Sequence, residues 1–190
     1  MKKSSRGGSY LKRLPDAFYH GQSYIHWTMT IENRKTGWLI PIFYYKFREL
    51  LTHTMFRYKI CCPIFCLMPD HMHLLWLGVS PDSDQRLAMK FLRGQLNLVL
   101  NAFEVQLQDQ PYDHVLDHEE TQPFALENLV EYIARNPERK QLVRPDGFRL
   151  YNNTSCLVPG YPNLDPFQDD FWDRFDSLVS QLRRQWSTNP

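Results

Sequence analysis

The chain has 190 residues, with an apolar fraction of 43% and a charged fraction of 23%, which suits one soluble domain with a buried core. Its formal net charge of +1 excludes inferring a nucleic-acid partner from overall charge alone. The sequence shows no apolar run of membrane-spanning length and no signal peptide, and its four cysteines lack the repeated pairing of a zinc site. We therefore expect a cytoplasmic protein with reduced thiols and no membrane association.

The charged residues suggest three parts. Residues 1–21 carry Lys, Arg, Ser and Gly with no acid before Asp16, so we expect a basic N-terminal arm. A globular domain should occupy residues 22–150. Residues 151–190 are expected to form a C-terminal extension with a helix packed on that domain.

Apolar periodicity predicts the secondary structure in chain order. Ile25, Trp27 and Met29 alternate with polar residues such as His26 and Thr28, which indicates a half-buried strand. The expected elements are a strand over 23–31, a helix over 41–58, strands over 59–67 and 71–79, a helix over 85–106, a strand over 111–116, and helices over 121–136 and 167–186. Residues 137–166 lack periodicity and are expected to wrap the core.

This order of elements is the split βαβ pattern of ferredoxin-like α+β folds, with an antiparallel sheet and here an extra C-terminal helix. The same fold carries many unrelated functions. Function must therefore be argued from individual side chains.

Two histidines mark the start of the third expected strand. His71 and His73 are two residues apart, so a strand directs both imidazoles to one face. Histidine is a common metal ligand, and a strand holds ligands firmly. With seven histidines in 190 residues, such a pair arises by chance in about one chain in four. The pair alone is therefore compatible with a solvated sheet face as well as with a metal site.

A second polar cluster follows near the end of the helix expected over 121–136. Tyr132 and Asn136 are four residues apart, so one helix would place them on the same face. Pro137 should end or bend that helix just after Asn136. A phenol can act as a covalent nucleophile and a carboxamide oxygen can bind a hard cation.

The two clusters in this order resemble a known family. The stretches LMPDHMHLLW over 67–76 and YIARNPERKQLV over 132–143 are similar to those of the REP-associated tyrosine transposases, which belong to the HUH single-strand DNA transposases with one catalytic tyrosine. The resemblance covers about residues 20–150. Within this range, residues 24–34, 95–97 and 112–115 also resemble the family. Asp70 stands where many members have Asn, and Lys140 and Gln141 replace the usual Ala-Gly.

The resemblance implies a mechanism and a set of partners. His71, His73 and Asn136 would bind Mg²⁺ or Mn²⁺, and Tyr132 would attack a phosphodiester of single-stranded DNA to give a 5′-phosphotyrosine. The substrate would be single-stranded or hairpin DNA, at REP-like repeats, and a monomer is favoured over a homodimer. Basic residues that we expect to contact DNA are Lys12, Arg13, Arg86, Lys90, Arg93, Arg135, Arg139 and Lys140.

Three alternatives stay open at this point. The chain could be a catalytically silent DNA-hairpin-binding protein that has kept only the fold. It could be a metal-dependent phosphoesterase that uses His71 and His73 while Tyr132 is a core residue. It could also be a structural ferredoxin-like module without chemistry.

Overall fold

A computed structural model describes residues 14–161 and 164–187 of the chain. Its sheet has five strands in the order β4-β1-β3-β2-β5, and all neighbouring strands are antiparallel. The first four strands have the order of a ferredoxin-like sheet, so the predicted α+β class and split βαβ pattern are confirmed. The strands are β1 (Tyr24–Thr30), β2 (Ile60–Met68), β3 (His71–Gly78), β4 (Tyr112–Val115) and β5 (Thr154–Leu157).

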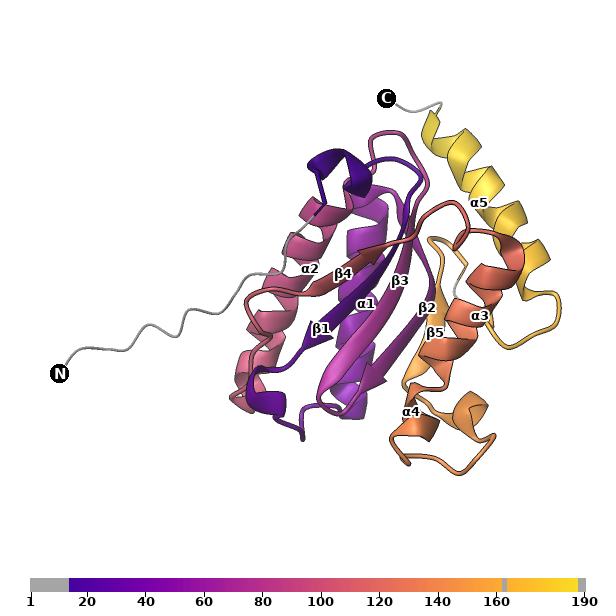
Figure 1. Ribbon diagram of the computed structural model, residues 1–190. Helices are drawn as coiled ribbons and strands as arrows, with labels where there is room; N and C mark the ends of the chain where they lie inside the picture. The colour runs from indigo at the N-terminus through magenta and orange to yellow at the C-terminus, as the bar shows by residue number, and fades with distance from the viewer. Residues whose placement is uncertain (1–13, 162–163, 188–190) are drawn as a thin grey trace.

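Four of the α-helices in the described residues cover this sheet, α1 and α2 on one face and α3 and α5 on the other, and the short α4 lies at one end of it (Figure 1). They are α1 (Pro41–Tyr58), α2 (Gln85–Leu100), α3 (Pro123–Ala134), the short α4 (Asn136–Arg139) and α5 (Phe171–Ser187). Short 3-10 turns lie at residues 16–19, 32–34, 101–103 and 148–150. No helix within the described ranges is long and apolar enough to span a bilayer.

The first face of the sheet packs against α1 and α2. Pro41 opens α1, where its fixed φ suits the first turn, and Lys59 ends the helix in a left-handed conformation. The Asp84 carboxylate caps α2 by accepting a hydrogen bond from the Leu87 amide. The alternating apolar residues of β1, such as Trp27, enter the core between these helices and the sheet.

The second face packs against α3 and α5. Cys66, Met68 and Leu75 lie in one buried cluster with α3 residues, and Cys61 and Leu77 lie in another with α5 residues. Because both faces are covered, every residue of β2 and β3 is buried. This second face also carries His71 and His73, since they alternate with Met72 and Leu74 of the first core.

Several element boundaries differ from the expected ones. The helix expected over 85–106 ends at Leu100 and continues only as a 3-10 turn over residues 101–103. Glu104 then adopts a left-handed φ and the chain turns back, so that Leu107 bridges to Ile31, just after β1. The final helix begins at Phe171 rather than at residue 167. The prediction of an irregular segment over 137–166 is wrong for β5, which pairs with β2. Four residues are too short to show a clear period in the sequence.

Candidate metal and nucleophile site

The two histidines of β3 form the centre of the candidate site. The Nε2 atoms of His71 and His73 lie 3.1 Å apart, with the ring planes nearly perpendicular at 87°. Their exposed fractions are 7% and 9%. The tight β2–β3 turn at Pro69 and Asp70 places His71 at the first position of the strand, where it pairs with Met68. The alternation of a strand therefore brings the two rings together, as the sequence predicted.

Asp70 and Arg34 fix the orientation of the first ring. The Nδ1 atom of His71 lies 2.6 Å from Asp70 Oδ1, and Arg34 Nη1 donates to the other carboxylate oxygen at 3.0 Å. Burial opposes ionisation of Asp70, yet the hydrogen bonds from His71 and Arg34 outweigh it and lower the pKa of this carboxyl. Because an ionised carboxylate only accepts, His71 carries its proton on Nδ1 and keeps the Nε2 lone pair.

The second ring is held from β1. His73 Nδ1 lies 3.1 Å from His26 Nε2 and 3.1 Å from Thr28 Oγ1. Burial, together with the neighbouring imidazoles and Arg139, lowers the pKa of His73 to about 3. Burial and the proximity of His114 lower the pKa of His26 to about 4. Both rings are therefore neutral at pH 7, which is the form that binds metal ions.

The end of α3 brings the tyrosine cluster to the same side of the sheet. Ile133 and Ala134 of α3 share a buried cluster with Cys66 and Met68 of β2, the register partners of His73 and His71. The short α4 lies at the end of the sheet that carries the β2–β3 turn (Figure 1). The end of α3 and the start of α4 are thus held against β2, which is the neighbour of the histidine strand β3.

Asn136 does not continue the helix of Tyr132, which corrects the prediction of one helix over 121–136. The first helix ends at Ala134, and Asn136 is the first residue of α4. The Asn136 Nδ2 atom donates to the carbonyl oxygens of Tyr132 at 3.1 Å and Ile133 at 3.0 Å. These bonds use the amide nitrogen, and the Oδ1 atom is the group that could act as a metal ligand. Asn136 is 9% exposed.

Tyr132 is solvent-accessible and has a cation on its ring. Its exposed fraction is 48%, and the Arg139 guanidinium carbon lies 4.0 Å from the ring centroid, within the range of a cation–π contact. Arg139 Nη1 also donates to the Tyr132 carbonyl at 3.1 Å. The phenol is therefore open to a ligand and has a positive charge fixed beside it.

The residues present suit a divalent cation bound by two imidazoles and a third ligand of another type. Within residues 14–161 and 164–187, no three His, Cys, Asp or Glu side chains are placed to hold one ion, so a third protein ligand would be of another kind, for which the Asn136 amide oxygen is the candidate. Adjacent ligands of an octahedral ion at 2.0–2.1 Å are separated by about 3.0 Å. The 3.1 Å between the two Nε2 atoms matches that spacing.

The expected DNA-contact residues fall into separate groups. Arg86, Lys90 and Arg93 lie on α2, on the face of the sheet opposite to His71 and His73, beside a cavity of about 660 Å³. Arg86 is paired with Asp16 at 2.6 Å, and Arg93 donates to the Gln108 carbonyl. Lys12 and Arg13 lie outside the described residues.

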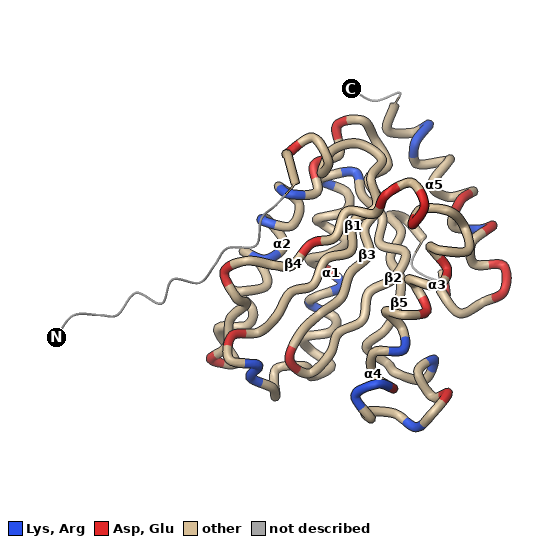
Figure 2. The backbone as a smooth tube through the Cα atoms, in the orientation of Figure 1, with Lys and Arg blue, Asp and Glu red and all other residues tan. Residues whose placement is uncertain are grey.

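The remaining three basic residues lie around α4, where blue segments gather in Figure 2. Arg135 is engaged by three carboxylates, with Glu131 at 2.6 Å, Glu138 at 3.0 Å and Asp146 at 3.4 Å. Arg139 lies on the Tyr132 ring, and Lys140 is exposed. Arg139 and Lys140 are thus better placed than Arg135 to meet a phosphate near Tyr132.

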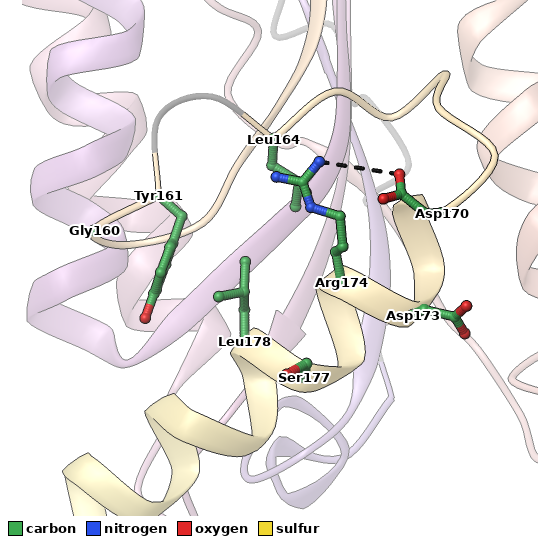
Figure 3. A pocket seen from close by; sticks show the side chains of 8 residues that line it. All are labelled: Gly160, Tyr161, Leu164, Asp170, Asp173, Arg174, Ser177 and Leu178. Carbon is green, nitrogen blue, oxygen red and sulfur yellow. Dashed lines mark ion pairs between the residues drawn. The ribbon is translucent and has the colours of Figure 1, made fainter.

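A different cavity, of about 580 Å³, lies beside α5 (Figure 3). Leu164 and Leu178 line it, and Arg174 and Asp170, one helical turn apart, form an ion pair at 4.0 Å beside it. It holds none of the histidines, and Tyr132 is not among its lining residues. The chemistry-bearing side chains of the chain therefore do not meet in this cavity.

Sequence reasoning missed three residues that support the histidine pair: His26, Thr28 and Arg34. The alternation of β1 placed His26 and Thr28 on its polar face, but only the β1–β3 register, which pairs Thr28 with His73, shows that this face meets the histidines. Arg34 lies in a turn where nothing in the sequence indicates a partner.

The fold can be compared with solved structures. Neither a model of a protein family nor a curated protein matches the chain. A REP-associated tyrosine transposase bound to a REP hairpin is similar, with a TM-score of 0.62 and 17% identity, over 77% of this chain and 82% of that one. A candidate transposase from Deinococcus radiodurans R1 is more weakly similar, with a TM-score of 0.42 and 14% identity, over 68% of this chain and 98% of that one. This chain therefore has the fold of a REP-associated tyrosine transposase.

Proposed function

We propose that the chain is a DNA transposase of the HUH tyrosine type, which cleaves and rejoins single-stranded DNA beside hairpins of the REP kind. The observation that carries the proposal is the facing pair of His71 and His73 Nε2 atoms on the strand next to the end of the Tyr132 helix. The likeness of fold to a transposase bound to a DNA hairpin supports the substrate class.

In this proposal His71, His73 and Asn136 hold Mg²⁺ or Mn²⁺. Such an ion, when bound, would supply Lewis-acid chemistry at the oxygens of the scissile phosphate. The orientation of the ligands is supplied by the chain itself, because Asp70 directs His71 and hydrogen bonds to the helix end direct Asn136.

Tyr132 is the proposed nucleophile. Its Oη attacks the phosphorus while the bond from phosphorus to the 3′ oxygen breaks, which leaves a 5′-phosphotyrosine and a free 3′-hydroxyl. The phenol loses one proton and the departing 3′ oxygen gains one, so protons balance. The covalent link keeps the phosphodiester energy, and a 3′-hydroxyl can reverse the step without ATP. The guanidinium of Arg139 lies over the Tyr132 ring, where its positive charge can meet a phosphate bound beside the nucleophile.

Arg139 and Lys140 are proposed to hold phosphates of the strand next to Tyr132. Single-stranded nucleic acid is bound by such cationic surfaces, and a hairpin is recognised largely by shape. All proposed catalytic groups come from one chain, so we propose a monomer as the active form.

Covalent capture tests the proposal. The protein is mixed with Mn²⁺ and end-labelled single-stranded oligonucleotides from repeats around its own gene, and products are separated on a denaturing gel. We expect a labelled band at protein mass with the parent chain, and none with Tyr132→Phe or His71→Ala. Tyr45→Phe is the matched control, since Tyr45 is an exposed tyrosine on α1 and its loss should leave the adduct unchanged.

The same gel separates the alternatives. Cleavage that persists with Tyr132→Phe would contradict the tyrosine mechanism and favour a metal-dependent phosphoesterase. DNA binding without cleavage or adduct by the parent chain, across the whole set of repeats, would favour a silent hairpin-binding protein.

A further inference from the structure

Two side chains of β1 occupy the side of His73 that faces away from His71. The His73 Nδ1 atom is 3.1 Å from Thr28 Oγ1 and 3.1 Å from His26 Nε2. Thr28 pairs with His73 in the β1–β3 register, so the sheet itself sets the position of the hydroxyl. His26 and His73 are both buried, which leaves these two groups as the partners of this nitrogen.

The two nitrogens of His73 have different neighbours and must have different roles. Its Nε2 atom faces His71, so a cation shared by the two rings binds there. A neutral imidazole carries one proton. Coordination through Nε2 therefore requires the proton on Nδ1, where a buried N–H needs an acceptor. The Thr28 hydroxyl can accept it, and so can Nε2 of His26 in the tautomer that carries its own proton on Nδ1.

His26 is not placed to be a ligand of the same ion. Its Nε2 atom meets His73 on the Nδ1 side, whereas the shared space with His71 lies on the Nε2 side. The three rings thus follow one another in a row and do not surround one point, in agreement with the absence of a three-residue metal cluster among the described His, Cys, Asp and Glu side chains.

We infer that Thr28 and His26 are positioning residues which hold His73 in the tautomer with the proton on Nδ1 and thereby set the affinity of the site for a divalent cation. The inference rests on the proposed function, which supplies the cation. Asp70 does the corresponding work for His71. Each histidine ligand then has its own acceptor, one from the β2–β3 turn and the other from β1.

Mn²⁺ binding to the full chain without DNA tests the inference. Affinity is measured by the loss of the electron paramagnetic resonance signal of free Mn²⁺. We expect Thr28→Val to weaken binding about 10-fold and the double variant with His26→Leu to weaken it about 100-fold. Thr28→Ser keeps the hydroxyl and should restore affinity to within about 2-fold of the parent. Thr54→Val is the matched control, because it removes a buried threonine hydroxyl bonded within α1.

The imidazoles give a second readout, from long-range ¹H–¹⁵N spectra of protein loaded with diamagnetic Mg²⁺. The His73 Nδ1 proton should be protected from exchange with water in the parent and should exchange faster in the double variant, which lacks both acceptors. A purely structural role for Thr28 and His26 would leave this exchange unchanged. A Thr28→Val chain that binds Mn²⁺ as tightly as Thr28→Ser would overturn the inference, and this comparison stands even where the double variant does not fold.

The outcome can be separated from failure of the proposed function. A parent chain that does not bind Mn²⁺ would remove both the metal assignment and this inference. A parent chain that binds Mn²⁺, with the expected losses in the variants, but forms no DNA adduct would contradict the transesterase alone.

Discussion

Asp70 connects the β2–β3 turn to the candidate metal site. Its carboxylate accepts hydrogen bonds from both His71 and Arg34, and its pKa is lowered because these bonds outweigh the cost of burial. A carboxylate behind a histidine ligand fixes the ring and raises its basicity. Asp70 stands where many members of the resembling transposase family have Asn. Its contacts show that it is part of the site and does not disturb it.

Asp70→Asn should lower the free energy of unfolding by about 1 kcal/mol, since the amide oxygen can accept from only one of the two donors with full strength. Urea denaturation in the presence of a chelator measures the change. Asp82→Asn is the control, because Asp82 is paired with Lys59 on the surface and its loss should cost less than about 0.5 kcal/mol. Equal losses for the two variants would show that Asp70 makes only a surface ion pair.

At the level of elements, the sequence predicted the strands and helices of the ferredoxin-like core because most show an apolar period or a continuous apolar run bounded by turn residues. It also predicted that His71 and His73 share a face, which depends only on alternation. It could not predict that Thr28 meets His73, because the β1–β3 register depends on pairing between strands far apart in sequence. The break after Ala134 also escaped prediction, since it depends on Asn136 bonding back to helix carbonyls.

The four cysteines lie in different buried clusters, which are covered by different helices. Cys61 and Cys156 lie under α5 in one cluster, Cys66 lies under α3, and Cys62 lies on the opposite face. Burial raises the pKa of Cys66 and of Cys156 to about 12 and also raises the pKa of Cys61 and Cys62. All four should therefore react slowly as long as their covering helices stay in place.

Phe175→Ala should expose one pair of these thiols selectively. Phe175 is fully buried in the α5 cluster, and its truncation should cost about 3–5 kcal/mol. We expect Cys61 and Cys156 to react with a disulfide reagent at pH 8 faster than Cys62 and Cys66, as read by peptide mass spectrometry. The parent chain in urea, in which all four should react, is the control. Equal acceleration of all four thiols would mean that α5 is not an independent cover.

At the scale of the whole molecule, the two faces of the sheet are used differently. The α1–α2 face is a mainly apolar core, in which the buried Gln85 accepts a hydrogen bond from Trp27. The other face is apolar under α3 and α5, but along β1 and β3 it buries a polar row of His26, His73 and His71. Burying neutral imidazoles is favourable only while they remain unprotonated. The fold therefore has a built-in sensitivity to acid at the position of its candidate site.

Stability should accordingly fall as the pH is lowered from 7 to 5. The folded pKa of His26 is lowered to about 4 and that of His73 to about 3, whereas both groups titrate near 6.5 in the unfolded chain. Below pH 6.5 the unfolded chain gains protons that the folded chain excludes, so each histidine should cost about 2 kcal/mol by pH 5. Carboxyl groups with a lowered pKa, such as Asp70, lose their contribution to stability only at lower pH.

Urea denaturation with a chelator at pH 7, 6 and 5 measures the fall in stability. His26→Gln should remove about half of it, and His53→Gln, on the exposed side of α1, should leave it intact. A fall of the same size with His26→Gln would show that protonation elsewhere governs acid stability.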